Sequence, residues 1–438
     1  MAVWALVMLA VAVALLLIGY PVAFTLGAVA LLFGGIALGL DFFTLLPLRI
    51  WGVMTNFTLI AVPLFVFMGI VLEKSGIAEA LLETMTRLFG RVRGGMAVSI
   101  VLVGALLAAT TGVVGATVVT MAVIALPVML RHGYRPELAT GTIAAAGTLG
   151  QIIPPSIILV LLGDVMGVPV GRLFMAAVTP GLLLIALFIL YVLVRAKLRP
   201  LEAPALPIDD DVGALWPQIF KGLIPPLLLV FAVLGSIFFG IASPTESAAV
   251  GALGALLLAA THKKLNLANL REAMRSTTRM TSMVFMILIG ATAFGLVFRG
   301  MGGDELVKQL MTGLPGGAWG FLLVSMLVIF VLGFFLDFIE ISFIVVPILA
   351  PIAAFLGVDM LWFAVLIALN LQTSFLTPPF GFSLFYLKAA APPTIRMPQI
   401  YRGIVPFVII QLVALLLVAL FPQLTLWLPD MMDALQGY

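Results

Sequence analysis

The sequence predicts an all-α polytopic membrane protein made of inverted repeats, with two re-entrant hairpins and two broken helices. Three observations support this fold class. The chain is 63% hydrophobic and only 9% charged, which leaves too little polar surface for a soluble domain. Apolar runs of about 20 residues, the length that spans a bilayer, recur along the chain. Two Pro-Pro pairs, at 154–155 and 378–379, interrupt such runs.

The two interruptions are GTLGQIIPPS, from Gly147 to Ser156, and NLQTSFLTPPFG, from Asn370 to Gly381. Proline removes a backbone donor and clashes with the preceding turn, so no continuous helix is expected through either stretch. In lipid, a broken helix persists only where protein or a water-filled cavity satisfies the freed backbone groups. Two breaks in corresponding places therefore predict a buried polar site of the kind that secondary transporters use.

The first half predicts five crossings and one hairpin. In chain order we expect crossings at 2–18, 22–40 and 57–73, an interfacial amphipathic helix within 74–93, a hairpin at 97–130, a broken crossing at 137–165 and a crossing at 173–194. Thr110–Thr117 divides the hairpin into legs of about 13 or 14 residues, too short to span the bilayer. A single long tilted helix is the alternative interpretation of this segment.

The second half repeats this plan. We expect crossings at 221–240, 245–260 and 281–298, an amphipathic stretch at 304–311, a hairpin at 317–356, a broken crossing at 360–387 and a crossing at 404–421. Three pairs of prolines occupy like places in the two halves with offsets of 223, 220 and 224: Pro21 and Pro244, Pro127 and Pro347, and Pro154 and Pro378. The near-constant offset predicts an internal duplication.

This plan divides the chain into scaffold, arm and transport segments. We assign scaffold helices to 1–73 and 221–298, a scaffold helix with a cytoplasmic connector to 173–220, interfacial arms to 74–96 and 299–316, a transport domain to 97–172 and 317–388, and a final helix with a periplasmic tail to 389–438.

The distribution of basic residues predicts the orientation. If both termini lie outside, only Arg49, Arg172, Arg299 and Lys308 are outside, which is 4 of the 22 Lys and Arg. Loops on the cytoplasmic side carry an excess of Lys and Arg, so this bias supports ten crossings and hairpins that do not cross. The two halves then have opposite orientations, as in inverted repeats.

Four elements are expected to meet at mid-membrane: the hairpin tips Thr110–Thr117 and Gly333–Ser342 and the two breaks. They contain no Lys or Arg, so backbone dipoles, hydroxyl groups and co-bound cations would have to neutralise an anionic substrate, which favours cation symport. The polar side chains clustered there are candidate substrate ligands: Thr117, Thr148, Gln151, Ser156, Asn370, Gln372 and Ser374.

Asp337 and Glu340 are the only carboxylates in these four elements. A carboxylate at the bilayer centre costs about 2.5–3.5 kcal/mol on insertion scales, so it usually has a partner or a task. Three roles remain open for Asp337: a sodium ligand, a proton carrier or a helix cap. Glu340, one turn along, is expected to face the entrance.

Several function classes lack their signatures. The chain has no Cys and no GxxxxGK[ST] motif, and its two histidines lie in charged connecting segments. We therefore expect neither ATP-driven transport nor enzymatic activity, and no catalytic residue. The basic pI of about 9.3 follows from the inside loops and does not predict nucleic-acid binding.

Five motifs together resemble the large membrane subunit of tripartite ATP-independent periplasmic (TRAP) transporters. They are PVAFTLG at 21–27, TTGVVGATVVTMAVIALPVM at 110–129, GTLGQIIPPSI at 147–157, SPTESAAVGALGA at 243–255 and LNLQTSFLTPPFGFSLFYLK at 369–388. The resemblance covers essentially the whole chain. It implies an elevator-type secondary transporter of the bacterial inner membrane, with both termini periplasmic and lipid around it.

The resemblance also implies partners and ligands. These are Na⁺ as the coupling ion with no other cofactor, an organic acid such as a C4-dicarboxylate, a 2-oxo acid or sialic acid, a periplasmic substrate-binding protein, and a small four-helix membrane subunit on a separate polypeptide. Carried over by position, the cation sites would involve Thr110, Gly112, Gly147, Gly150, Gly333, Asp337, Thr373 and Thr377. The alternatives are a stand-alone sodium-coupled dicarboxylate symporter or ion antiporter of the same type, and a channel or non-transporting scaffold.

Overall fold

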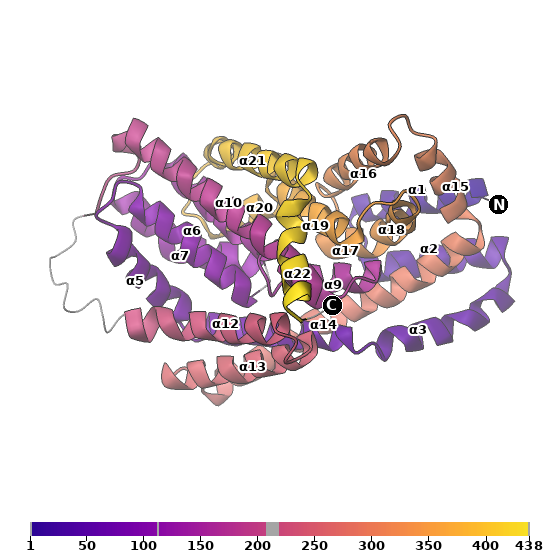
Figure 1. Cartoon of the computed structure of the whole chain (residues 1–438), viewed down its shortest axis with the longest axis horizontal. Helices are drawn as coiled ribbons and strands as arrows, with labels where there is room; N and C mark the ends of the chain where they lie inside the picture. The colour runs from indigo at the N-terminus through magenta and orange to yellow at the C-terminus, as the bar shows by residue number, and fades with distance from the viewer. Residues whose placement is uncertain (1, 112–113, 207–218, 437–438) are drawn as a thin grey trace.

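The computed structural model describes residues 2–111, 114–206 and 219–436. Within these ranges the regular structure is entirely helical, as predicted (Figure 1). The first half contains α1 (Ala2–Ile18), α2 (Val22–Ala37), η1 (Leu40–Leu45), α3 (Leu46–Met54), η2 (Thr58–Ile60), α4 (Ala61–Lys74), α5 (Ile77–Phe89), α6 (Gly95–Thr111), α7 (Val114–Arg131), α8 (Pro136–Thr148), η3 (Leu149–Gln151), α9 (Ile157–Met166), α10 (Val170–Leu198) and η4 (Pro200–Glu202).

The second half is also helical. It contains η6 (Ile219–Leu223), α12 (Ile224–Phe238), α13 (Pro244–Thr261), α14 (Leu267–Gly300), α15 (Gly303–Thr312), α16 (Ala318–Leu332), α17 (Phe338–Ile344), α18 (Val346–Phe355), α19 (Met360–Leu376), α20 (Phe382–Ala390), α21 (Met397–Leu420) and α22 (Gln423–Gln436). Helices α2 and α13 begin at Val22 and Pro244, and α8 and α19 begin at Pro136 and Met360, which are separations of 222 and 224 residues.

Both predicted breaks are present. After α8 the chain passes through η3 and is extended at Ser156, and α9 then begins at Ile157. After α19 it is extended at Thr377, and α20 begins at Phe382. The proline pairs fall inside these breaks, and the bond between the two prolines is cis in each. The local chemistry of proline therefore ended both helices where the sequence indicated.

The lengths of the hairpin legs were predicted wrongly. Helices α6 and α7 have 17 and 18 residues, because α6 continues to Thr111 and α7 begins at Val114, both inside the predicted tip, and each also extends slightly beyond 97–130. The two helices contact each other and both pack against α8, so this segment is not one continuous tilted helix. By length and hydropathy, α7 could span a membrane alone.

Two further helices were not predicted. Helix α3 precedes α4, and the two form a pair bent by 56°, whereas α14 runs unbroken for 34 residues in the other half. The predicted periplasmic tail contains helix α22, which packs on α10 and α19. An ion pair of 2.9 Å between Arg172 and Asp433 joins α22 to the start of α10. Tertiary contacts thus hold a helix in the segment that the sequence analysis assigned to a periplasmic tail.

Among the described residues, five helices are long and apolar enough to cross a membrane, or seven if each bent pair is one span. Helices α1, α2 and α12 are apolar but have 17, 16 and 15 residues. The predicted count of ten depends on including these shorter helices.

The helices pack as two groups. Helices α2, α4, α13 and α14 form the densest contacts of the first group, joined by α1 and α12. The second group is centred on α8, which packs against α6, α7 and α21, with α10 beside α6 and α21. Gly141 and Gly403 bring α8 and α21 together so closely that a Cβ on Gly141 would lie 2.2 Å from the Gly403 carbonyl oxygen. Small residues permit such close packing of membrane helices.

Candidate functional site

A cavity of about 410 Å³ lies where several helix ends meet. Helices α4, α7, α9, α14, α17, α19 and α20 all contribute to its wall. The lining residues are Val66, Val114, Gly115, Ala116, Val119, Ile157, Met280, Met283, Val284, Asp337, Phe338, Ile339, Phe375 and Tyr386. The first hairpin, the second hairpin and both broken segments therefore reach one cavity, and none of its lining residues is basic.

Asp337 is the only charged side chain in this lining and the only predicted site residue there. Its carboxylate accepts the Phe338 N–H at 2.7 Å, at the start of α17. The Asp337 N–H in turn donates to Glu340 Oε2 at 3.1 Å, so the two carboxylates form a capping box. The capping geometry is present, and the Asp337 carboxylate has further lone pairs that the cap does not use.

Two longer helices begin at the cavity. Val114 is the first residue of α7 and Ile157 is the first residue of α9, and both line it. The N-terminus of a helix carries partial positive charge and unpaired N–H groups, so it attracts anions. The cavity thus combines two positive helix ends with one carboxylate.

Most predicted hydroxyl ligands are bonded within their own helices. The Thr373 and Thr377 hydroxyls donate to the carbonyls of Leu369 and Thr373, four residues earlier, at 2.8 and 2.7 Å. Thr148 and Ser374 donate to the carbonyls three residues earlier, those of Ala145 and Leu371. Ser156, just before α9, donates to the Gln151 carbonyl in η3, and Thr117 is buried on α7. None of these residues lines the cavity.

The two breaks touch through one side-chain hydrogen bond. The Gln372 amide donates from Nε2 to the Thr148 hydroxyl oxygen at 3.5 Å, which joins α19 to the end of α8. Gln151 is fully buried, and neither of its amide atoms has a hydrogen-bond partner; Gln372 Oε1 is also unpartnered. Buried polar atoms normally have partners, so these amides indicate a place prepared for a ligand, ion or water. Asn370 instead donates to the Met326 carbonyl at 2.7 Å.

The predicted glycines have different positions. A Cβ on Gly147 would lie 2.3 Å from Val118 Cγ2, and one on Gly333 would lie 2.1 Å from Ser374 Oγ. Both glycines therefore allow close helix contact. Gly150 lies in η3 and Thr110 in the last turn of α6, whereas Gly112 lies outside the described residues.

Sequence reasoning missed Met280, Met283 and Tyr386. All three line the cavity, and the Tyr386 ring lies so near α7 that a Cβ on Gly115 would be 3.2 Å from it. Tyr386 follows the second break by one helical turn, which is the only sequence signal that could have identified it.

A second cavity, of about 650 Å³, separates α3 and α14 from α9, α17 and α18. Asn56 donates from its side-chain amide to the half-buried carboxylate of Asp164 on α9, across this cavity. At the other end of α4, Thr120 of α7 donates to Glu73 at 3.3 Å. Two polar contacts thus join α4 and its preceding turn to the second helix group.

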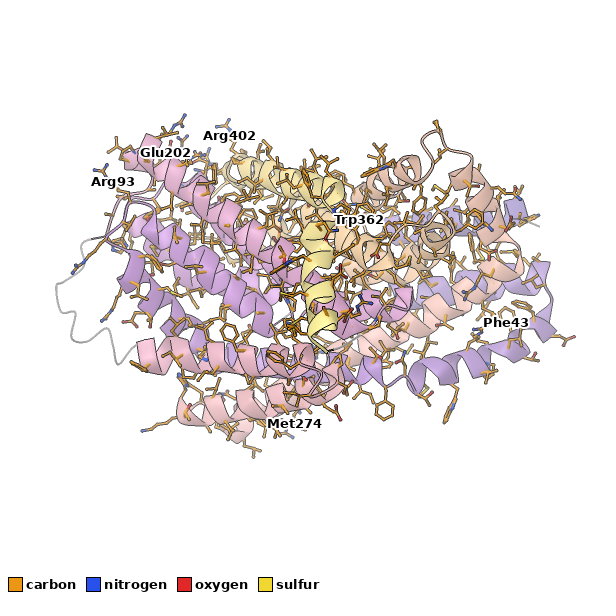
Figure 2. All side chains as sticks on the ribbon, viewed as in Figure 1. Phe43, Arg93, Glu202, Met274, Trp362 and Arg402 are labelled. Carbon is orange, nitrogen blue, oxygen red and sulfur yellow. The ribbon has the colours of Figure 1, made fainter. Side chains whose placement is uncertain are left out.

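The connector after α10 contains a glutamate that is surrounded by arginines. Glu202 accepts hydrogen bonds from Arg135, Arg195 and Arg199. Although burial raises its pKa, these three guanidinium groups hold the pKa of Glu202 at about 2. Figure 2 shows Glu202 toward one end of the molecule. This cluster joins the start of α8 to the end of α10.

Comparison with known proteins supports one assignment. A family model described as "Tripartite ATP-independent periplasmic transporter, DctM component" matches residues 9–424. The chain is 31% identical to the C4-dicarboxylate TRAP transporter large permease protein DctM of Pseudomonas aeruginosa, over 88% of this chain and 89% of that protein. It is 31% identical to the sialic acid TRAP transporter large permease protein SiaM of Vibrio cholerae, over 95% and 96%. It is 28% identical to the ectoine TRAP transporter large permease protein TeaC of Halomonas elongata, over 97% and 99%.

A solved structure shares the fold. The Alcanivorax borkumensis YdaH transporter superposes with a TM-score of 0.63 at 14% identity, covering 95% of this chain and 98% of that one. Together with the apolar helices, these matches describe a multi-pass inner-membrane transport protein. The chain belongs to the family of large permease subunits of TRAP transporters.

Proposed function

We propose that this chain is the permease through which a TRAP system takes up an organic acid, such as a C4-dicarboxylate, together with Na⁺. The observation that carries the proposal is the central cavity, where α7 and α9 begin, Asp337 is the one charged side chain, and no basic residue lies in the lining. A carboxylate substrate would be attracted to the helix ends and repelled by Asp337. A co-bound cation removes that repulsion, so substrate and cation would bind best together.

The cation sites are proposed at the predicted positions Thr110, Gly112, Gly147 and Gly150 in one half and Gly333, Asp337, Thr373 and Thr377 in the other. Among these positions Asp337 has the strongest structural support as a cation ligand, because it lines the cavity. The unpartnered amide of Gln151 supports the proposed substrate contacts at the breaks.

We propose that the chain consists of two inverted repeats and transports its substrate by an elevator movement of one helix group against the other. The close packing of α10 on α6 and of α21 on α8 supports a moving unit that includes α10 and α21, which the sequence division had placed in the scaffold and the final segment. The static unit then consists of α1, α2, α4 and α12 to α14. The dense contacts within each group, and the cavity between α14 and α9, suit movement of one against the other.

The proposed partners are a periplasmic binding protein and a small membrane subunit. Support comes from the family and from a longer relative, the isethionate TRAP transporter permease protein DctMQ of Oleidesulfovibrio alaskensis, which is 27% identical over 94% of this chain. The chain spans 64% of that relative's length. Both termini are proposed to be periplasmic.

Reconstitution tests the proposal. Proteoliposomes would contain this chain with or without the small subunit, and the binding protein loaded with a labelled dicarboxylate would be added outside. We expect uptake only with all three proteins and an inward Na⁺ gradient, and without ATP. Full uptake by this chain alone would favour the stand-alone symporter, and uptake without Na⁺ would contradict the proposed coupling.

A further inference from the structure

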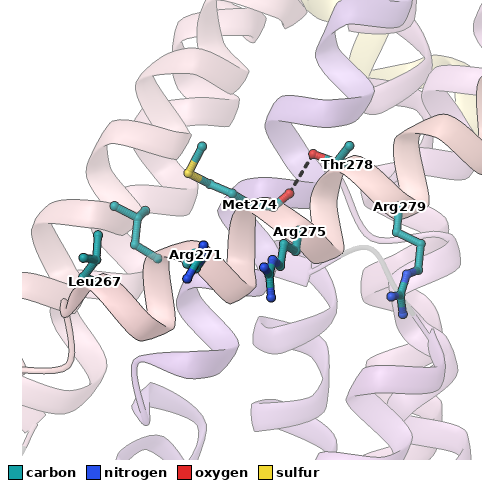
Figure 3. A pocket seen from close by; sticks show the side chains of 7 residues that line it. Leu267, Arg271, Met274, Arg275, Thr278 and Arg279 are labelled. Carbon is teal, nitrogen blue, oxygen red and sulfur yellow. Dashed lines mark hydrogen bonds between the residues drawn. The ribbon is translucent and has the colours of Figure 1, made fainter.

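Three arginines form a row along α14. Arg271, Arg275 and Arg279 are four residues apart, so they lie about 6 Å from one another along the axis and nearly on one face. All three are exposed, and they line a groove of about 910 Å³ together with Leu267, Leu270, Met274 and Thr278 (Figure 3). We call this row the arginine ladder.

The start of the ladder faces away from the cavity that Asp337 lines. At 100° per residue, Ala273 and Met280 lie on the face of α14 opposite Arg271, whereas Arg279 lies only about 40° around the helix from Met283, which also lines that cavity. Ala273 is buried and Met280 lines the central cavity, so that opposite face is the one packed into the fold. The nearest carboxylate in the chain, Glu272, pairs with Lys74 at 2.8 Å. No carboxylate in the described part of the chain is paired with a ladder arginine.

From the sequence of α14 we infer that the ladder lies at the depth of lipid headgroups. The apolar part of α14 begins directly after Arg279, and the whole helix, at 34 residues, exceeds the roughly 20 that span the hydrocarbon core. Leu267 and Met274, which are 81% and 56% exposed, lie among the arginines. Guanidinium groups bind phosphate bidentately, and exposed apolar side chains beside them suit acyl chains.

We propose that the arginine ladder is a binding site for anionic phospholipids, whose phosphodiester groups pair with Arg271, Arg275 and Arg279. The bound lipid neutralises three like charges spaced closely on one helix, and it fixes the end of α14 at the membrane surface. Because the site is on the outer face of the fold, this inference does not depend on the transported substrate.

A lipid titration tests the proposal. The chain has no Cys, so Thr278→Cys gives a single label position in the groove, and Thr278 otherwise bonds only the Met274 carbonyl of its own helix. The labelled protein in neutral detergent would be titrated with phosphatidylglycerol and, separately, with phosphatidylcholine. We expect a saturable fluorescence change with phosphatidylglycerol alone, and half-saturation at about tenfold higher concentration or more when Arg271, Arg275 and Arg279 are all changed to Gln.

The matched control removes three other exposed basic residues: Arg93→Gln, Lys197→Gln and Arg402→Gln. Figure 2 shows Arg93 and Arg402 far from Met274, and the control should leave the titration unchanged. Arg275→Glu alone is the second variant if the triple ladder variant does not fold, and it should also weaken binding.

Four results would overturn the proposal. The first is an equal fluorescence change with phosphatidylcholine, and the second is an unchanged phosphatidylglycerol titration in the ladder variants. The third is an equal fluorescence change with inorganic phosphate in place of lipid. The fourth is a ladder variant that no longer binds the small subunit although its lipid titration is normal. The last result would assign the groove to the protein partner.

Discussion

The contact between Asn56 and Asp164 should bias the protein toward the conformation described here. The bond joins the turn before α4 to the end of α9, which lie on opposite sides of the cavity that separates the two helix groups. Any movement of α9 past α4 must break it. A hydrogen bond to a charged group contributes about 1.5–3 kcal/mol, and the half-buried carboxylate keeps access to the cavity, which favours the lower figure. Asn56→Ala should therefore shift the equilibrium roughly tenfold toward other conformations.

Cross-linking of these two positions tests directly whether α9 must move past α4 during transport. In the cysteine-free chain, Asn56→Cys with Asp164→Cys can be joined by a short bifunctional thiol reagent. We expect the cross-link to stop counterflow in proteoliposomes, and its cleavage to restore it. Asn56→Ala should change the counterflow rate, whereas Thr292→Ala is the control, because Thr292 lines the same cavity but bonds only Leu288 of its own helix. Normal counterflow through the cross-linked protein would refute the proposed movement.

Two further predictions concern stability in detergent. Glu202→Gln removes a carboxylate whose pKa is lowered from 4.5 to about 2. This shift corresponds to a contribution of roughly 3 kcal/mol to the free energy of unfolding, which screening by water reduces to about 1–2 kcal/mol. The contribution is complete above pH 4.5 and is lost as the pH falls toward 2, so thermal midpoints of the two proteins should differ at pH 7 and converge in acid; a constant difference would contradict this assignment. Gly147→Ala overpacks the contact with Val118 and should lower the free energy of unfolding by about 1–3 kcal/mol, and with it the thermal midpoint. Adding Val118→Ala should recover part of the lost thermal midpoint. No recovery would show that the clash lies elsewhere.

The sequence predicted the features that depend on local chemistry. The proline pairs located both breaks, and the small and hydroxyl residues around them indicated where helix ends meet. Asp337 could be selected because a carboxylate in an apolar segment is expensive. These arguments need no knowledge of which helices are neighbours.

The rest depends on tertiary packing. The sequence could not show that the Thr373 and Thr377 hydroxyls donate to the carbonyls one turn back, which leaves only their oxygen lone pairs for a ligand. Met280 and Tyr386 look like ordinary core residues until α14 and α20 are brought to the cavity. Likewise, the predicted tail contains a packed helix, and the ion pair that joins this helix to α10 links Asp433 to Arg172, which is distant in the chain.

Sodium titration of uptake by Asp337→Asn tests the central claim most directly. Asn keeps the size and a carbonyl oxygen, and it caps helices about as well as Asp, so α17 should still form. With the complete system in proteoliposomes, we predict much weaker uptake that depends less steeply on Na⁺, with a normal thermal midpoint. If only the pH dependence disappears, Asp337 carries a proton. An unchanged Na⁺ titration would contradict a cation site at Asp337.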